Sequence, residues 1–300
     1  MSSYNAMVVP TLGNMKLLSN ISKFINAQTT DDFVLIFIVQ KDAEIGMLTE
    51  ELDKTIDRSF KIIPQRENFI IGAMNRVLEL PYDNIILTDD DAQPAQSYIA
   101  NAIEFLEKNT DAGCVFGKVN NSFPDSYKSK VFRTYNFLSS RKKLFGEQSY
   151  RGFNTAGMPI GGVFPNFNKG VVRDYMPIGV SMAWRQNSIN KFRLSHYGKR
   201  GVFYESYISA ALWLSGLETY YSPTLSVEHL DLESLSRSKL LFNQDIISEL
   251  YTSPLILYNM GFAIDQNAIS KLLTLIKIYP KELRFQIRKK LINTLQEIKK

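Results

Sequence analysis

The feature that most constrains the fold is a series of short apolar runs separated by helical patterns. Phe33–Val39 is apolar at every position, and Ala6–Val9 and Asn84–Thr88 are similar shorter runs. Apolar residues recur at helical spacing between them, as in residues 14–25 and 44–58. Strands that are buried on both faces and joined by helices form right-handed βαβ units. We therefore predict an α/β fold with a mostly parallel central sheet flanked by helices.

Composition excludes several other classes of protein. Apolar residues make up 45% of the 300 residues and charged residues 22%, which excludes a disordered or collagen-like chain. Phe33–Val39 is the longest apolar run and is far shorter than the ~20 residues of a membrane-spanning helix. Cys114 is the single cysteine, so an internal disulfide and a cysteine zinc site are excluded. The N-terminus lacks a signal-peptide pattern, and we expect a cytoplasmic protein.

The net charge of +5 is concentrated at one end of the chain. Residues 281–300 contain seven Lys/Arg and two Glu, which leaves 28 basic and 28 acidic residues in the rest of the chain. A nucleic-acid groove spreads basic residues over a whole face. We therefore expect no nucleic-acid partner.

Three adjacent carboxylates, Asp89, Asp90 and Asp91, follow the apolar run that ends at Thr88. Parallel sheets bind ligands at this carboxyl edge. The carboxylates repel one another and have no Lys or Arg within ten residues, so a nearby cation would stabilise them. Oxygen ligands of this kind suit Mg²⁺ or Mn²⁺. A solvated acidic loop that caps the following helix is the alternative.

Several motifs in order make the chain resemble the family 2 glycosyltransferases, which have the GT-A fold. The strand ending at Pro10-Thr11, the acidic triplet before Pro94 and the segment 177–185 occupy matching places. The segment 201–206 and His229 complete the match, which covers roughly residues 5–230. The resemblance implies an enzyme that uses an Asp-x-Asp-type motif to hold a divalent metal against the diphosphate of a nucleotide sugar.

The resemblance also implies roles for individual residues. The nucleotide-side candidates are Pro10, Thr11, Gln40, Asn68 and Asn75, with Asp89 or Asp90 at the ribose and Asp91 and His229 at the metal. Gln40 stands where the family usually has a carboxylate, and Ile70 where it often has glycine. A strand-ending turn is the alternative for Pro10 and Thr11, and a structural histidine is the alternative for His229.

The catalytic base is the position where the sequence departs most from the family. Ser206 stands where the family has an aspartate, so Glu205, the nearest carboxylate, is our candidate base. A helix-terminal acid without a catalytic role is the alternative. Trp184, Lys199, Arg200 and Arg237 are candidates for contacts with the acceptor or with phosphate, and surface loops are the alternative for the three basic residues.

The resemblance, together with the acidic triplet, implies a metal-dependent glycosyltransferase with a UDP- or GDP-sugar donor and a saccharide or lipid-linked saccharide acceptor. We expect inversion at the anomeric carbon. We expect a catalytic domain over 1–234, with its donor half at 1–118 and its acceptor half at 119–234, and a helical region over 235–300. The alternatives are a non-catalytic nucleotide- or sugar-binding relative and a sugar nucleotidylyltransferase, although residues 10–14 lack the basic glycine-rich loop of the latter.

The C-terminal segment 281–300 combines basic residues with an apolar stripe at helical spacing. The stripe consists of Leu283, Ile287, Leu291, Leu295 and Ile298. Such a helix can lie on an anionic membrane surface. It can also pack its stripe on the domain and leave its lysines in water.

Overall fold

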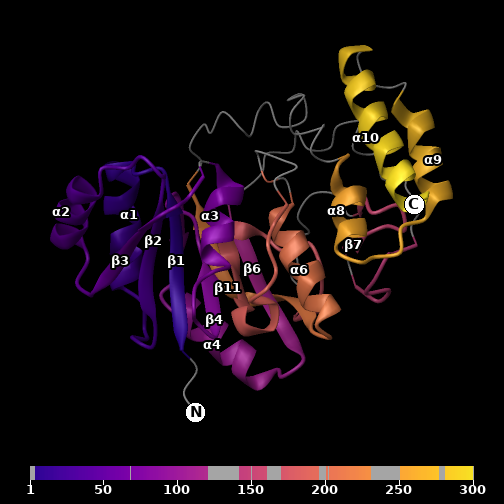
Figure 1. Ribbon diagram of the computed structural model, residues 1–300. Helices are drawn as coiled ribbons and strands as arrows, with labels where there is room; N and C mark the ends of the chain where they lie inside the picture. The colour runs from indigo at the N-terminus through magenta and orange to yellow at the C-terminus, as the bar shows by residue number, and fades with distance from the viewer. Residues whose placement is uncertain are drawn as a thin grey trace.

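A nine-stranded sheet organises the molecule (Figure 1). The computed structural model describes residues 4–67, 69–120, 142–149, 151–160, 170–195, 201, 203–230, 251–276 and 281–299. The strand order is β3 (Phe60–Pro64), β2 (Val34–Val39), β1 (Asn5–Thr11), β4 (Asn84–Leu87), β10 (Met182–Arg185), β6 (Ala112–Asn120), β11 (Glu218–His229) and β5 (Ala92–Pro94), with β9 (Val172–Arg173) beside β11. β10, β5 and β9 run against the other six strands. The predicted mostly parallel sheet is therefore confirmed.

Helices cover both faces of this sheet because its strands are apolar on both faces. One face packs against α1 (Met15–Asn26), α2 (Ile45–Thr55) and α4 (Tyr98–Lys108), and the other packs against α3 (Ile70–Val77) and α6 (Tyr204–Leu214). In β2, Leu35, Phe37 and Val39 face the first set, whereas Ile36 and Ile38 face the second. This alternation explains the unbroken apolar run in the sequence.

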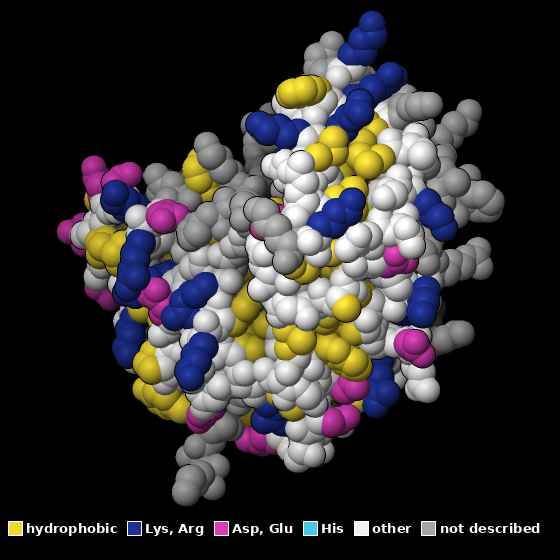
Figure 2. Space-filling view, turned by 45° about the vertical axis from the view of Figure 1, so that its right-hand side comes forward, with side chains coloured by type: hydrophobic (Ala, Val, Ile, Leu, Met, Phe, Trp, Pro, Cys, Tyr) yellow, Lys and Arg dark blue, Asp and Glu magenta, His cyan; other side chains and the backbone are white. Residues whose placement is uncertain are grey.

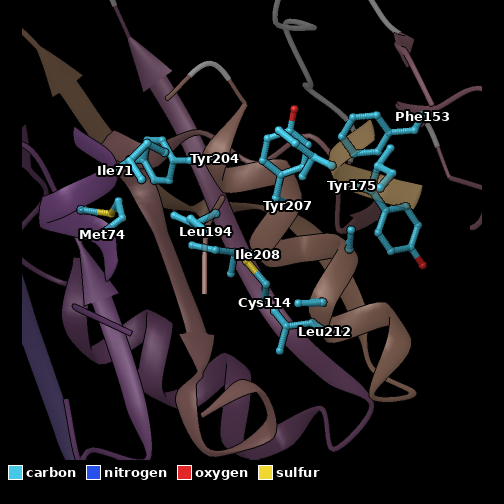
Figure 3. Packing of buried hydrophobic residues seen from close by; sticks show 14 of the residues in the cluster. Ile71, Met74, Cys114, Phe153, Tyr175, Leu194, Tyr204, Tyr207, Ile208 and Leu212 are labelled. Atoms are coloured by element: carbon cyan, nitrogen blue, oxygen red, sulfur yellow. The ribbon is translucent and has the colours of Figure 1, made fainter. Parts of the chain in front are cut away.

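The second half of the chain adds short elements around α6. Strands β7 (Gly152–Phe153) and β8 (Pro159–Ile160) form a separate hairpin, and 3-10 helices occupy Gly179–Ser181 and Gln186–Ile189. Figure 3 shows Ile208 and Leu212 of α6 close to Cys114 of β6, and Tyr207 on the side of Phe153, with which its ring stacks. An aromatic cluster of Phe145, Phe153, Tyr175, Trp213 and Phe262 continues this core toward the C-terminal helices.

Three helices, α8 (Ser253–Asn259), α9 (Gln266–Leu275) and α10 (Lys281–Lys299), lie beyond α6, at the opposite end of the molecule from α1 and α2 (Figure 1). They share one continuous apolar core with the sheet. The described part of residues 235–300 is thus helical, as predicted. The division of the chain at residue 234 stays a prediction.

The apolar stripe of α10 faces the protein. Leu283, Ile287 and Leu291 are at most 2% exposed, and Leu295 and Ile298 pack against the same core. The stripe therefore packs on neighbouring helices, which is the second of the two expectations for this segment, and contact of residues 281–300 with a membrane stays a prediction. No helix in the described part of the chain is both long and apolar enough to cross a bilayer.

Candidate functional site

The acidic triplet lies at the carboxyl edge of the sheet, where β4 ends at Leu87. Two buried hydrogen bonds fix this strand end: the Thr88 hydroxyl donates to the Val180 carbonyl at 3.0 Å, and the Tyr98 hydroxyl donates to the Leu87 carbonyl at 2.8 Å. Both anchors are themselves inaccessible to solvent. The chain therefore leaves the sheet along a defined path and presents three carboxylates in succession.

Asp90 ties the end of β4 to the end of β1. The Thr11 hydroxyl donates to Asp90 Oδ2 at 2.6 Å and accepts from the Gly13 amide at 2.9 Å. Since the site contains three neighbouring carboxylates, a strong donor on the middle one reduces the repulsion between them. The turn after β1 and the acidic loop thus form one unit.

Asp89 and Asp91 form a second group with His229. One ligand atom from each lies within 4.8 Å of the other two, and the His229 Nε2 atom is 3.3 Å from Asp91 Oδ1. The pairing of β5 with β11 brings them together, because it places His229 opposite Ala92. The Leu230 amide also donates to the Asp91 carbonyl at 2.9 Å. Residues distant in the sequence are therefore held together by the backbone.

The electrostatics of this group favour a cation. Burial, followed by the negative charges of Asp91, Asp90 and Glu205, raises the pKa of Asp89 to about 8. Burial also raises the pKa of Asp90, although the hydrogen bond from Thr11 opposes it. A divalent ion would stabilise the ionised carboxylates.

The donor set suits Mg²⁺ or Mn²⁺. It contains two carboxylates, which are the ligands that these ions favour, and one imidazole nitrogen beside them. The His229 Nδ1 atom lies 3.0 Å from the Leu230 carbonyl, which orients the ring and leaves Nε2 facing Asp91. These residues therefore fit the metal that the resemblance implies.

Glu205 lies in the first turn of α6, half-buried and near the acidic group. Its Oε1 atom accepts a hydrogen bond from the Gly179 amide at 3.2 Å. Burial nevertheless outweighs the hydrogen bonds and raises the pKa of Glu205 to about 7. A carboxyl group with such a pKa can exchange a proton near neutral pH.

Backbone geometry at two positions sets the place of Glu205. Phe203, just before α6, has a φ of 63°, which is rare for a residue with a side chain. A Cβ atom at Gly179 would lie 2.1 Å from the Tyr204 hydroxyl and 2.9 Å from Glu205 Oε1. Only glycine permits the close approach of this backbone to the two side chains.

One sequence expectation changes in the structure, and Ser206, at the family's usual base position, is buried. Trp184 lies in the middle of the sheet with 0% exposure, and its indole donates to Gln186 Oε1, so the expectation that it contacts an acceptor is wrong. Ser206 is 1% exposed and its hydroxyl lies 3.3 Å from Met176 Sδ, which is a packing role.

The other candidates occupy varied positions. Pro10 is the last residue but one of β1, and Gln40 follows β2, so both lie at the same sheet edge as the acidic triplet. The Asn75 side chain donates to the Leu194 carbonyl and accepts from the Leu194 amide. This pairing fastens α3 to the later segment, and a nucleotide contact by Asn75 stays a prediction. Asn68, Lys199, Arg200 and Arg237 lie outside the described residues.

The sequence did not reveal the residues that support the site. Thr88, Tyr98 and Tyr204 act through long-range packing that local patterns do not encode. The short strand β5 was also not predicted, because its three residues fall within an expected loop and helix start. Gly179 is the exception, since its position in the matching segment 177–185 had already drawn attention to it.

Comparison with known proteins supports the fold. No family model matches the sequence, and no curated protein matches it. Solved structures that match include S. aureus TarS in complex with UDP-GlcNAc, which is 9% identical, with 99% of this chain and 90% of that chain covered and a TM-score of 0.58.

A mannosyltransferase from Pyrobaculum calidifontis, in complex with GDP-Man and Mn²⁺, is 14% identical and has a TM-score of 0.50. The match covers 99% of this chain and 87% of the mannosyltransferase chain. A mycobacterial protein is 11% identical, with 85% of this chain and 75% of that chain covered and a TM-score of 0.52. The expected GT-A fold is thus confirmed.

Proposed function

We propose that this protein is a metal-dependent glycosyltransferase that moves a sugar from a nucleoside-diphosphate sugar to a hydroxyl group. The observation that carries the proposal is the group of Asp89, Asp91 and His229 at the carboxyl edge of the sheet. It occurs in a fold shared with a mannosyltransferase that binds GDP-Man and Mn²⁺ and with a protein that binds UDP-GlcNAc. The motif order described above favours family 2.

The chain supplies distinct groups for the two halves of the donor. Asp89, Asp91 and His229 would hold Mn²⁺ or Mg²⁺, which neutralises the charge of the departing diphosphate. Asp90 and Thr11 hold the loop rigid, so that binding costs little reorganisation. Gln40, at the neighbouring strand end, would contact the base with an amide in place of the family's carboxylate.

Glu205 would act as the general base. The acceptor oxygen forms a bond to the anomeric carbon while the bond from that carbon to the diphosphate oxygen breaks, and the hydroxyl proton moves to the Glu205 carboxylate. A pKa of about 7 leaves a substantial ionised fraction at neutral pH. Attack from the side opposite the diphosphate inverts the anomeric carbon. A saccharide or a lipid-linked saccharide would supply the hydroxyl.

Calorimetry with GDP and UDP, with and without Mn²⁺, tests this proposal. Asp91→Asn removes a charged ligand from a loop position whose side chain is 21% exposed, and we expect it to abolish Mn²⁺-dependent nucleotide binding while the melting temperature changes little. Asp53→Asn, at an exposed position of α2, is the matched control. Unchanged Mn²⁺-dependent affinity in Asp91→Asn would contradict the metal assignment.

Ser206 favours one alternative function. Because the family's usual base position holds a buried serine, the chain could bind a nucleotide sugar without transferring the sugar. An assay for hydrolysis or transfer of radiolabelled UDP- and GDP-sugars in the presence of Mn²⁺ distinguishes a glycosyltransferase from such a binding protein. Nucleotide binding without any turnover across an acceptor panel would support the non-catalytic protein.

A further inference from the structure

The outward side of α10 carries charge around one exposed aromatic ring. Lys281, Phe285 and Arg288 are spaced four and three residues apart and therefore share one side of the helix, and Lys289 lies next to them. All four side chains are exposed, and Phe285 is 72% exposed. We call these four residues the basic face of α10.

Packing of the opposite side holds this face outward. Leu283, Ile287 and Leu291 are fully or almost fully buried against the core, so the helix cannot rotate without exposing them. The Tyr258 hydroxyl of α8 also donates to the Glu297 carbonyl at 3.1 Å. The basic face is thus a fixed surface.

The first half of α10 carries an excess of positive charge. Residues 281–290 contain five Lys/Arg and one Glu. Figure 2 shows Lys and Arg side chains gathered around apolar ones over the upper end of the molecule, with little acidic surface beside them. The rest of the chain balances its charges, so this end is where an anionic partner would be attracted.

We propose that the basic face of α10 docks on an anionic lipid bilayer. Lysine and arginine side chains near such a surface are attracted to the lipid headgroups. An exposed phenylalanine among them fits the boundary between headgroups and acyl chains, where an aromatic ring leaves water. The combination favours a bilayer over a soluble polyanion, because a soluble polyanion gains nothing comparable from Phe285. The contact would use the side of α10 opposite to its buried stripe.

Sedimentation of the full chain with vesicles tests the proposal independently of any transferase activity. We expect binding to phosphatidylcholine vesicles that contain phosphatidylserine, weaker binding as salt rises, and none to phosphatidylcholine alone. Arg288→Gln with Lys289→Gln should weaken binding about 30-fold, since each basic residue contributes about fivefold. Phe285→Ser should weaken it about tenfold.

Matched variants elsewhere on the surface provide the controls. Lys54→Gln with Lys108→Gln removes the same charge from side chains that are 68% and 71% exposed, and Leu214→Ser removes an apolar side chain that is 51% exposed. Both controls should bind vesicles like the unmodified protein. Equal loss in the charge control, or no vesicle binding by the unmodified protein, would overturn the proposal. Binding to soluble polyphosphate with no effect of Phe285→Ser would overturn it in favour of a soluble polyanion.

Discussion

Replacing Glu205 with glutamine should stabilise the protein at high pH and leave its stability at low pH almost unchanged. Glutamine keeps the shape of the side chain and the oxygen that accepts from the Gly179 amide at 3.2 Å. It removes the charge that burial disfavours. The pKa of Glu205 rises from 4.5 to about 7 in the fold, which corresponds to about 3 kcal/mol.

The direction of the pH effect follows from this raised pKa. Below pH 4.5, Glu205 is protonated in both the folded and the unfolded chain, so the variant and the unmodified protein should be equally stable. Between pH 4.5 and 7, only the unfolded chain ionises readily, and the free energy of unfolding of the unmodified protein falls. Above pH 8, the variant should be more stable by about 3 kcal/mol.

Urea unfolding at a series of pH values, with a chelator present, measures this difference. Glu50→Gln, at an exposed position of α2, is the matched control and should change the free energy of unfolding by less than about 0.5 kcal/mol at every pH. If Glu205→Gln and the unmodified protein gave parallel curves from pH 4.5 to 8, Glu205 would not be a carboxyl group with a raised pKa.

Three further predictions concern the catalytic base, the hydrogen bond between Thr11 and Asp90, and the buried stripe of α10. Glu205→Gln should lower turnover by ~10²–10⁴ with donor affinity nearly intact, and unchanged turnover in a radiolabelled-sugar assay would exclude Glu205 as base. Thr11→Val should lower the free energy of unfolding, measured with urea at pH 7, by about 1.5–3 kcal/mol, because Asp90 loses the hydroxyl that donates to it at 2.6 Å. A decrease smaller than about 0.5 kcal/mol would contradict a stabilising role for this hydrogen bond. Leu291→Ala should lower the free energy of unfolding by about 2–5 kcal/mol, because the Leu291 side chain is 0% exposed. Almost no change in this free energy would show that the stripe lies on the surface instead.

Local patterns predicted the helices and strands of the first half well. The helix expected to start after Asn14 begins at Met15, and the Asn14 side chain accepts from the Lys16 and Leu17 amides as a cap should. The strand expected at 33–39 is β2, Val34–Val39. These elements were predictable because apolar spacing and caps act over a few residues.

The order of strands was not predictable in the same way. β10 runs antiparallel between β4 and β6, and nothing in its four residues specifies those neighbours. Trp184 was therefore interpreted as a candidate acceptor contact, although its strand passes through the middle of the sheet. Tertiary packing decides such positions, and a single sequence carries little signal for it.

The acidic residues were located correctly at the sheet edge, and Asp91 and His229 were predicted to lie together, but the place of Asp89 beside them was not predicted. The sequence suggested Asp89 or Asp90 at the ribose, whereas the structure places Asp89 with Asp91 and His229 and turns Asp90 toward Thr11. Adjacent residues in a loop point in different directions according to backbone torsions. Those torsions depend on the hydrogen bonds of Thr88 and Leu230, which are long-range contacts.

Under the proposed metal assignment, the pairing of β5 with β11 makes metal affinity depend on the completion of folding. Asp89 and Asp91 follow β4, but His229 joins them only when the far end of β11 pairs with β5. A nascent chain that has emerged only as far as β6 would carry the carboxylates without the imidazole. Closing a loop of this length carries an entropy cost before the contact stabilises it. Tight Mn²⁺ binding would therefore appear late in synthesis and would mark chains whose sheet has closed.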